Sequence, residues 1–122
     1  MAKSNLLGLR TVIYAAPALA QTREWYTRAL GVEPYFDQPF YVGFNVGGYE
    51  LGLDPNAQVA DSSTITYWGV SSIKDSVQHF LDVGASLFAP IQDVGDGIHV
   101  ASLKDPFGNV VGLIENPHFS LP

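Results

Sequence analysis

The feature that most constrains the fold is an order of elements that occurs twice within 122 residues. Each half of the chain has the pattern of a strand, a helix that ends at a glycine, and three further strands. The interval from strand start to helix-ending glycine is 20 positions in the first half (11 to 31) and 19 in the second (65 to 84). The sequence therefore predicts an α+β fold made of two matched βαβββ modules.

In the first half, residues 11–16 have the composition of a strand, and Pro17 opens a helix because proline suits the first helical turn. An apolar stripe at helical spacing follows, and Gly31 ends it. The chain then predicts three strands, over residues 33–36, 40–46 and 49–53. Gly47 and Gly48 form a hairpin turn between the last two, because glycine tolerates positive φ.

The second half repeats this order, with a strand over residues 65–70 and a helix that Ser71 or Ser72 caps and Gly84 ends. Strands are predicted over residues 87–91, 98–103 and 109–115, with a loop over 92–97. The segment from Asp105 to Gly108 has the residues of a tight turn. We expect one domain over residues 1–122, with module one at about 8–54, a linker at about 55–63, module two at about 64–116 and a tail at 117–122.

Composition excludes several classes of function. The chain has no cysteine, so disulfides, thiolate catalysis and cysteine-bound metals are excluded. Its net charge is −6 and its six basic residues are scattered, which argues against a nucleic-acid partner. There is no signal-peptide pattern and no apolar run approaching the ~20 residues that a membrane span needs. We expect a cytoplasmic protein with no membrane partner.

Two motifs resemble a known family. The segments Trp25-Tyr26…Ala29-Leu30-Gly31 and Lys104-Asp-Pro-Phe-Gly-Asn109 resemble signatures of the glyoxalase/bleomycin-resistance/dioxygenase superfamily, also called the vicinal-oxygen-chelate family. The resemblance implies two βαβββ modules whose strands curl as a mixed sheet around a shared cavity, with the helices outside. Its members include metal-dependent enzymes and metal-free proteins that sequester antibiotics. Many are dimers, so the resemblance also implies a homodimer.

The resemblance further implies four metal-ligand positions, on the first and last strands of each module. In this chain they fall on Thr11, Glu50, Ile65 and Gly112. Only Glu50 offers a competent ligand, whereas catalytic metal sites normally keep about three protein ligands. We therefore expect no metal site of the family type and no cofactor.

Strand parity predicts which residues share the face of Glu50. It assigns Thr11 from the first strand and, across the first hairpin, Asn45 and Tyr41. In the second half it assigns Tyr67, and it places Leu103, Ala101 and His99 beside Val110, Gly112 and Ile114. The predicted ligand-binding residues are Glu50, Asn45, Tyr41, Tyr67, His99 and Thr11. The glycines at 43, 52, 69 and 112 either leave room for a ligand or relieve strain in curved strands.

Three functions remain open on the sequence. The first is a metal-independent small-molecule-binding protein that sequesters a cationic or aromatic ligand. The second is a lyase, isomerase or hydrolase with Glu50 as general base, its pKa raised by burial, together with His99 or Tyr67. The third is a metalloenzyme with displaced ligands, such as Glu50 with His99. Each of the two residues could also have no function in a site. Glu50 would then be a carboxylate bonded to Asn45 or a tyrosine, and His99 would be a partly exposed strand histidine.

Overall fold

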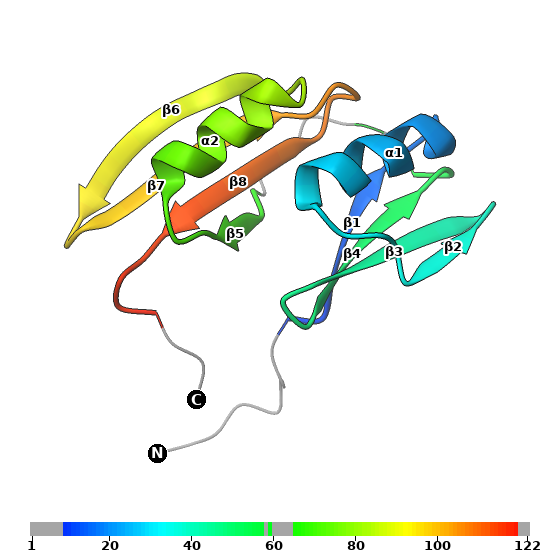
Figure 1. Ribbon diagram of the computed structural model, residues 1–122, viewed down its shortest axis with the longest axis horizontal. Helices are drawn as coiled ribbons and strands as arrows, with labels where there is room; N and C mark the ends of the chain where they lie inside the picture. Colours follow the sequence, from blue (N-terminus) through cyan, green and yellow to red (C-terminus); the bar gives the residue numbers. More distant parts are fainter. Residues whose placement is uncertain (1–8, 58, 60–64, 120–122) are drawn as a thin grey trace, which may run out of the picture. The chain divides into compact units, whose positions relative to one another are not determined.

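The computed structural model of the chain describes residues 9–57, 59 and 65–119 (Figure 1). The chain separates into two compact units, residues 1–57 and 58–122, and the division falls inside the predicted linker. We call these units the first and second modules and describe each by itself. Within the described residues, no helix is long and apolar enough to cross a membrane.

The first module has the predicted order of one strand, one helix and three strands. Its elements are β1 (Thr11–Ala15), α1 (Leu19–Leu30), β2 (Phe36–Gln38), β3 (Tyr41–Val46) and β4 (Tyr49–Asp54). The strands form one four-stranded sheet in the order β1-β4-β3-β2. β1 is parallel to β4, and the other two pairings are antiparallel. The parallel pair requires a crossover, which α1 and the strands after it provide.

The second module repeats this topology. Its elements are β5 (Tyr67–Gly69), α2 (Ile73–Asp82), β6 (Ser86–Gly95), β7 (Ile98–Lys104) and β8 (Val110–Glu115). The sheet order is β5-β8-β7-β6, with β5 parallel to β8. The predicted α+β class and the two βαβββ modules are thus confirmed.

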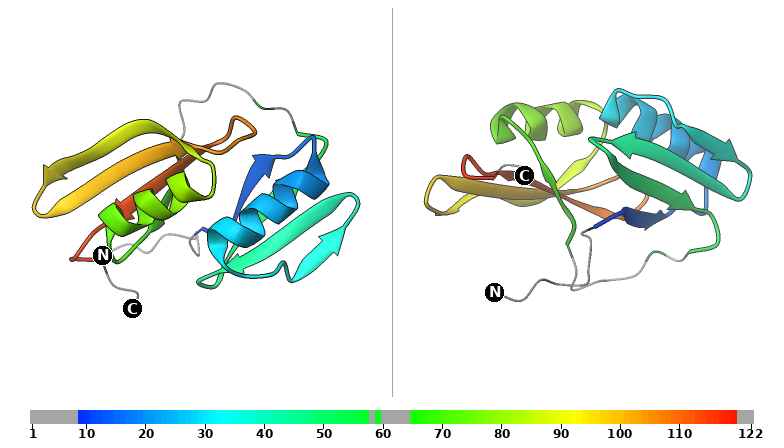
Figure 2. Two further views of the ribbon diagram at one scale, coloured as in Figure 1. Left: turned by 45° about the horizontal axis from the view of Figure 1, so that its top comes forward. Right: turned by 90° about the horizontal axis from the view of Figure 1, so that it is seen from below.

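In each module the helix packs against one face of the sheet, as Figure 2 shows. On this face of the first module, Phe44, Leu51 and Leu53 are buried beneath Trp25 and Tyr26 of α1. The second module buries an equivalent set beneath α2, namely Ala101, Leu103, Val111 and Leu113. Each large apolar side chain buried in this way stabilises the fold by about 1.5–3 kcal/mol.

The helices begin and end by different means. Gly31 ends α1 in the left-handed conformation, with φ of 74°, whereas Ala18 at its start provides no side-chain cap. At the start of α2, Ser72 accepts a hydrogen bond from the Asp75 amide at 3.3 Å. Glu115 of β8 also accepts one from the Ile73 amide at 2.9 Å. The sequence left the choice between Ser71 and Ser72 open, and the structure selects Ser72.

Three strands differ from the prediction by two residues or more at an end. β2 is Phe36–Gln38, whereas residues 33–36 were predicted, and β5 begins at Tyr67, whereas residues 65–70 were predicted. β6 runs on to Gly95, into the predicted loop 92–97. β6 is the edge strand of its sheet and is irregular, with three register shifts along its pairing to β7. An exposed, bulged edge strand lacks the apolar alternation from which strands are recognised.

The hairpin between β7 and β8 is organised by Asp105, which is only 4% exposed. Its carboxylate accepts hydrogen bonds from the backbone amides of Phe107 at 2.9 Å and Asn109 at 2.8 Å. A second oxygen accepts from the Asn109 side chain at 3.1 Å. The aspartate therefore replaces solvent for the turn's amide groups. This structural role explains the motif at residues 104–109, the second of the two that resemble the family.

Candidate functional site

Glu50 lies on β4 of the first module, on the sheet face opposite α1. It is directly opposite Thr11 of β1 and Asn45 of β3, so the three side chains project from one face. The next residue, Leu51, points the other way and is 1% exposed beneath the helix. The prediction that Thr11 and Asn45 share a sheet face with Glu50 is therefore confirmed. We refer to the face that carries Glu50 as the Glu50 face.

Two phenols hold the Glu50 carboxylate. The Tyr41 hydroxyl donates to Oε1 at 2.7 Å, and the Tyr35 hydroxyl donates to Oε2. Thr11 lies opposite Glu50 on β1, and its side chain also contributes to the lowered pKa of the carboxylate. Of the two bonding partners that the sequence left open, a tyrosine is therefore the correct one. Asn45 faces the same way, but its side-chain oxygen accepts from the Gly48 amide at 3.0 Å and stabilises the hairpin turn.

Glycines make room for this arrangement. A Cβ at Gly52 would lie 1.8 Å from the Tyr41 hydroxyl oxygen, and one at Gly43 would lie 2.8 Å from Glu50 Oε2. The Gly43 position would also crowd the Tyr35 ring, at 3.2 Å. Gly43 and Gly52 are direct partners on β3 and β4. The space that the sequence attributed to a ligand or to curvature is filled here by the side chains that hold Glu50.

Hydrogen bonding shifts the pKa values of Glu50, Tyr41 and Tyr35. The pKa of Glu50 is lowered, first by the Tyr35 hydrogen bond and further by those from Tyr41 and Thr11, against the opposing effect of burial. The pKa of Tyr41 is raised by burial and by its bond to Glu50, and that of Tyr35 is raised chiefly by its bond to Glu50. The expectation of a raised Glu50 pKa is wrong, because phenol donors outweigh partial burial.

Aromatic rings continue from the two phenols along the same part of the module. Phe36 lies opposite Gly43 and so shares the Glu50 face. Its ring packs on Phe40 with centroids 6.0 Å apart and on Tyr41 with centroids 6.2 Å apart. Tyr35 and Phe40 are each 63% exposed, and Phe36 is 37% exposed. We call Tyr35, Phe36, Phe40 and Tyr41 the aromatic patch.

Tyr35 is a site residue that strand parity did not predict. It lies just before β2, and its backbone amide bonds to the Gly43 carbonyl at 3.0 Å. The Tyr35 side chain reaches Glu50 across Gly43, through the space that a larger side chain at that position would fill. A lone carboxylate on a strand demands hydrogen-bond donors, and that demand was the available signal.

The matching position in the second module has no acid. The Glu50 amide bonds to the Arg10 carbonyl, and the Gly112 amide bonds to the Thr66 carbonyl, both at 2.9 Å. Gly112 is therefore the counterpart of Glu50. Its direct partner is Tyr67, which replaces Ile65 as the counterpart of Thr11. A Cβ at Gly112 would meet the Thr66 carbonyl oxygen at 2.6 Å and the Tyr67 ring at 2.7 Å.

The predicted pairing across the second hairpin is wrong by one residue. Gly112 lies opposite Ser102 and Ile114 lies opposite Val100, so Ala101 and Leu103 face α2 instead. The hairpin turn takes five residues, 105–109, because Asn109 is bonded into it by Asp105. His99 moves with this register and lies opposite Glu115.

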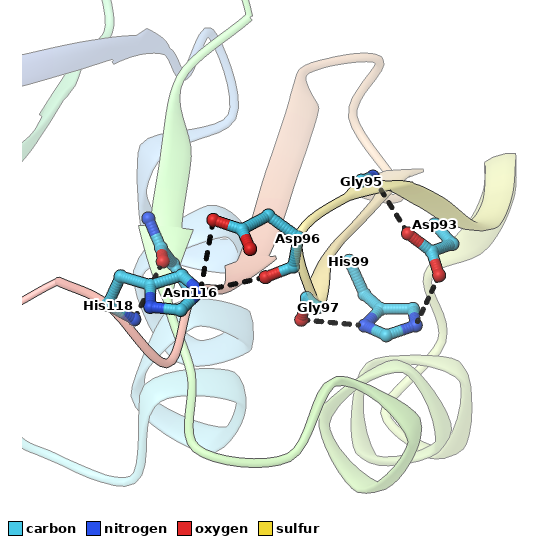
Figure 3. A network of polar contacts seen from close by, with 7 residues as sticks. All are labelled: Asp93, Gly95, Asp96, Gly97, His99, Asn116 and His118. Carbon is cyan, nitrogen blue, oxygen red and sulfur yellow. Dashed lines mark hydrogen bonds and ion pairs between the residues drawn. The ribbon is translucent and has the colours of Figure 1, made fainter.

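His99 contacts residues of its own hairpin (Figure 3). Its Nδ1 lies 3.2 Å from the Gly97 carbonyl oxygen, and its Nε2 lies 3.9 Å from the Asp93 carboxylate. Beside it, His118 Nε2 lies 2.8 Å from the Asp96 carbonyl oxygen and 3.3 Å from the Asp96 carboxylate. These contacts join the chain after β8 to the β6–β7 turn and are structural in character.

The residues present do not fit the metal site that the fold family implies. Glycine at 112 has no side-chain donor, and each oxygen of the Glu50 carboxylate already accepts a hydrogen bond from a phenol of its own module. Over the described part of the chain, no three or more His, Cys, Asp or Glu side chains gather where they could hold an ion. We therefore derive no chemical step through a metal.

Comparison with known proteins yields similarity of structure alone. No protein-family model matches the chain, and no curated protein matches it significantly. Solved structures do match. A glyoxalase-related enzyme from Fulvimarina pelagi has 15% identity and a TM-score of 0.78, with 96% of this chain and 94% of that one covered. A lactoylglutathione lyase from Agrobacterium tumefaciens has 16% identity and a TM-score of 0.75, with 96% and 99% covered.

A third match is a glyoxalase/bleomycin resistance protein/dioxygenase family enzyme from Burkholderia phytofirmans PsJN. It has 15% identity and a TM-score of 0.73, with 86% of this chain and 95% of that one covered. The agreement therefore extends over nearly the whole length of each chain. At these identities it establishes the fold and leaves the chemistry to the residues of the site.

Proposed function

This chain has the fold of the glyoxalase/bleomycin-resistance/dioxygenase superfamily, and on that premise we propose that it is a metal-independent small-molecule-binding protein. The ligand is cationic or aromatic, and it binds on the Glu50 face of the first module. Glu50 supplies the charge, and the aromatic patch supplies the apolar contact. The role resembles that of the antibiotic-sequestering members of the superfamily.

The observation that carries this proposal is a carboxylate kept ionised beside exposed aromatic rings. Three hydroxyl donors lower the pKa of Glu50, so it carries a full negative charge at neutral pH. Its hydrogen-bonded partners are the hydroxyl groups of Tyr35 and Tyr41, and neither is basic. A fixed anion beside exposed aromatic rings attracts an organic cation through both charge and ring contact.

The same geometry argues against Glu50 as the general base of an enzyme. A base works best when its pKa lies near the working pH, and the phenols move the pKa of Glu50 in the opposite direction. His99, the second catalytic candidate, is engaged with Asp93 and Gly97 of its hairpin. Binding is therefore the function that the described residues support best.

A thermal-shift screen of cationic and aromatic compounds tests the proposal. A ligand at a hundredfold excess over its Kd should stabilise the protein by about 2.7 kcal/mol and raise Tm by roughly 10 °C. Glu50→Gln should abolish most of that shift. Glu24→Gln, an exposed carboxylate on α1, provides the matched control. The proposal fails if no compound stabilises the protein, or if both variants respond as the wild type does.

A homodimer remains a prediction from the resemblance. Light scattering coupled to size-exclusion chromatography distinguishes a 13.2 kDa monomer from a particle of twice that mass.

A further inference from the structure

We propose that the Glu50 site selects cations that carry few or no N–H donors, such as a quaternary or tertiary ammonium or a delocalised aromatic cation. It should discriminate against primary ammonium and guanidinium groups. This inference rests on the proposed function and specifies its ligand class. It follows from how much of the carboxylate this chain's own residues already use.

The first step is the acceptor capacity of Glu50. An ionised carboxylate offers about four lone-pair positions. Tyr41 takes one on Oε1 and Tyr35 takes one on Oε2. About two positions are left for a ligand, one on each oxygen, although the full negative charge is still present.

The second step concerns what an incoming cation requires. A guanidinium binds a carboxylate best through two parallel N–H bonds, one to each oxygen. In this site each oxygen already accepts a hydrogen bond from a phenol, so the fork would have to compete with Tyr35 and Tyr41 at both oxygens. A primary ammonium presents three donors and meets the same shortage. A quaternary ammonium needs no acceptor and disturbs neither phenol.

The third step concerns what surrounds the charge. The carboxylate shares its face with Phe36, and Tyr35 and Phe40 are largely exposed. Aromatic faces attract a weakly hydrated organic cation, and such rings are the usual recognition element for quaternary ammonium ligands. The two tyrosine rings are oriented by their own hydrogen bonds to Glu50, so the phenols serve both as donors and as walls.

The test uses three probes that share one ring and differ in their donors: benzyltrimethylammonium, benzylammonium and benzylguanidinium. Isothermal titration calorimetry on the full chain at neutral pH should give benzyltrimethylammonium the lowest Kd, by roughly fivefold over benzylguanidinium. In the double variant Tyr35→Phe/Tyr41→Phe, two acceptor positions are freed while the charge remains. The preference should then disappear or reverse.

Tyr49→Phe is the matched control for the double variant. Tyr49 precedes Glu50 on β4, so its side chain points to the opposite face. The control should keep the wild-type preference. The single variant Tyr35→Phe should give an intermediate ratio of the Kd values. Because the Tyr35 side chain is exposed, this variant should still fold if the double variant does not.

The outcomes separate this inference from the proposed function. If benzylguanidinium or benzylammonium binds as tightly as the quaternary probe and Glu50→Gln weakens all three, the inference is overturned and the binding function stands. A preference that persists in the double variant also overturns the inference. If no probe binds, or Glu50→Gln leaves all three Kd values unchanged, the proposed function fails as well.

Discussion

The two modules share one topology and differ in chemistry at a matched position. β4 of the first module carries Glu50 where β8 of the second carries Gly112, and each residue's amide bonds to the strand beside it in the same way. One residue further on, Leu51 and Leu113 are 1% and 2% exposed under the helix of each module. The helix-facing residues therefore preserve the fold, and the opposite face is where chemistry can change.

The largest expected effects come from what the modules have in common. Leu51→Ala and Leu113→Ala should each lower the free energy of unfolding by about 2–5 kcal/mol, because each leaves a cavity under a helix. Urea denaturation followed by circular dichroism measures the change. Leu9→Ala, at a side chain that is 75% exposed, should have little effect. A large cost at only one of the two leucines would break the proposed equivalence.

Alanine at Gly112 of the second module and at Gly52 of the first should have different effects. At Gly112 the new Cβ meets a backbone carbonyl at 2.6 Å, so the strand must move and about 1–3 kcal/mol of stability should be lost. At Gly52 it meets the outer end of the Tyr41 side chain, which can turn away. Gly52→Ala should therefore cost little stability but weaken binding of benzyltrimethylammonium.

Unfolding and titration of the same two glycine variants check this contrast. If Gly52→Ala binds as the wild type does, Tyr41 is not needed to hold Glu50. If Gly112→Ala weakens binding as much as Gly52→Ala, the site is not confined to the first module.

Helix capping is a smaller difference between the modules. Ser72→Ala removes a side-chain cap from α2 and should cost about 0.5–2 kcal/mol. Ser71→Ala, one residue earlier and exposed, is its control and should be nearly neutral. The first module offers no equivalent loss, because Ala18 makes no side-chain cap. Equal effects at Ser71 and Ser72 in thermal unfolding would show that the assigned cap is wrong.

The smallest expected effect is that of pH on ligand binding between about pH 5 and pH 9. Glu50 has a lowered pKa and both phenols have raised ones, so none of the three changes charge in this range. The stabilisation by the ionised carboxylate is present above its unfolded pKa and is lost as pH falls through the lower folded value. Calorimetric Kd values for the quaternary probe that vary severalfold across this range would contradict the assignment.

The sequence predicted the features that periodicity and local turn chemistry determine. The stripes of both helices, Gly31 at the end of α1 and the Gly47-Gly48 turn follow from local preferences. The parity of Glu50 with Asn45 followed from a two-residue turn of known register, and that with Thr11 followed from the family resemblance.

What the sequence did not predict depends on contacts between distant residues. Asp105 draws Asn109 into the second turn, and this shifts the register of His99 by one residue. Tyr35 lies in the predicted strand 33–36 but just before the observed β2, and its hydroxyl reaches Glu50 past Gly43, a contact that alternation does not reveal. The direction of the Glu50 pKa shift depended on both phenols, and only one of them was assigned to the site from sequence.

The most direct test of the account is the pKa of Glu50 itself, measured by following its side-chain carboxyl carbon by NMR during an acid titration. We expect a midpoint below the ordinary value of 4.5, which should rise in Tyr35→Phe and rise further in Tyr35→Phe/Tyr41→Phe. A midpoint at or above 4.5 in the wild type would contradict the claim that two phenols hold this carboxylate as a fixed anion.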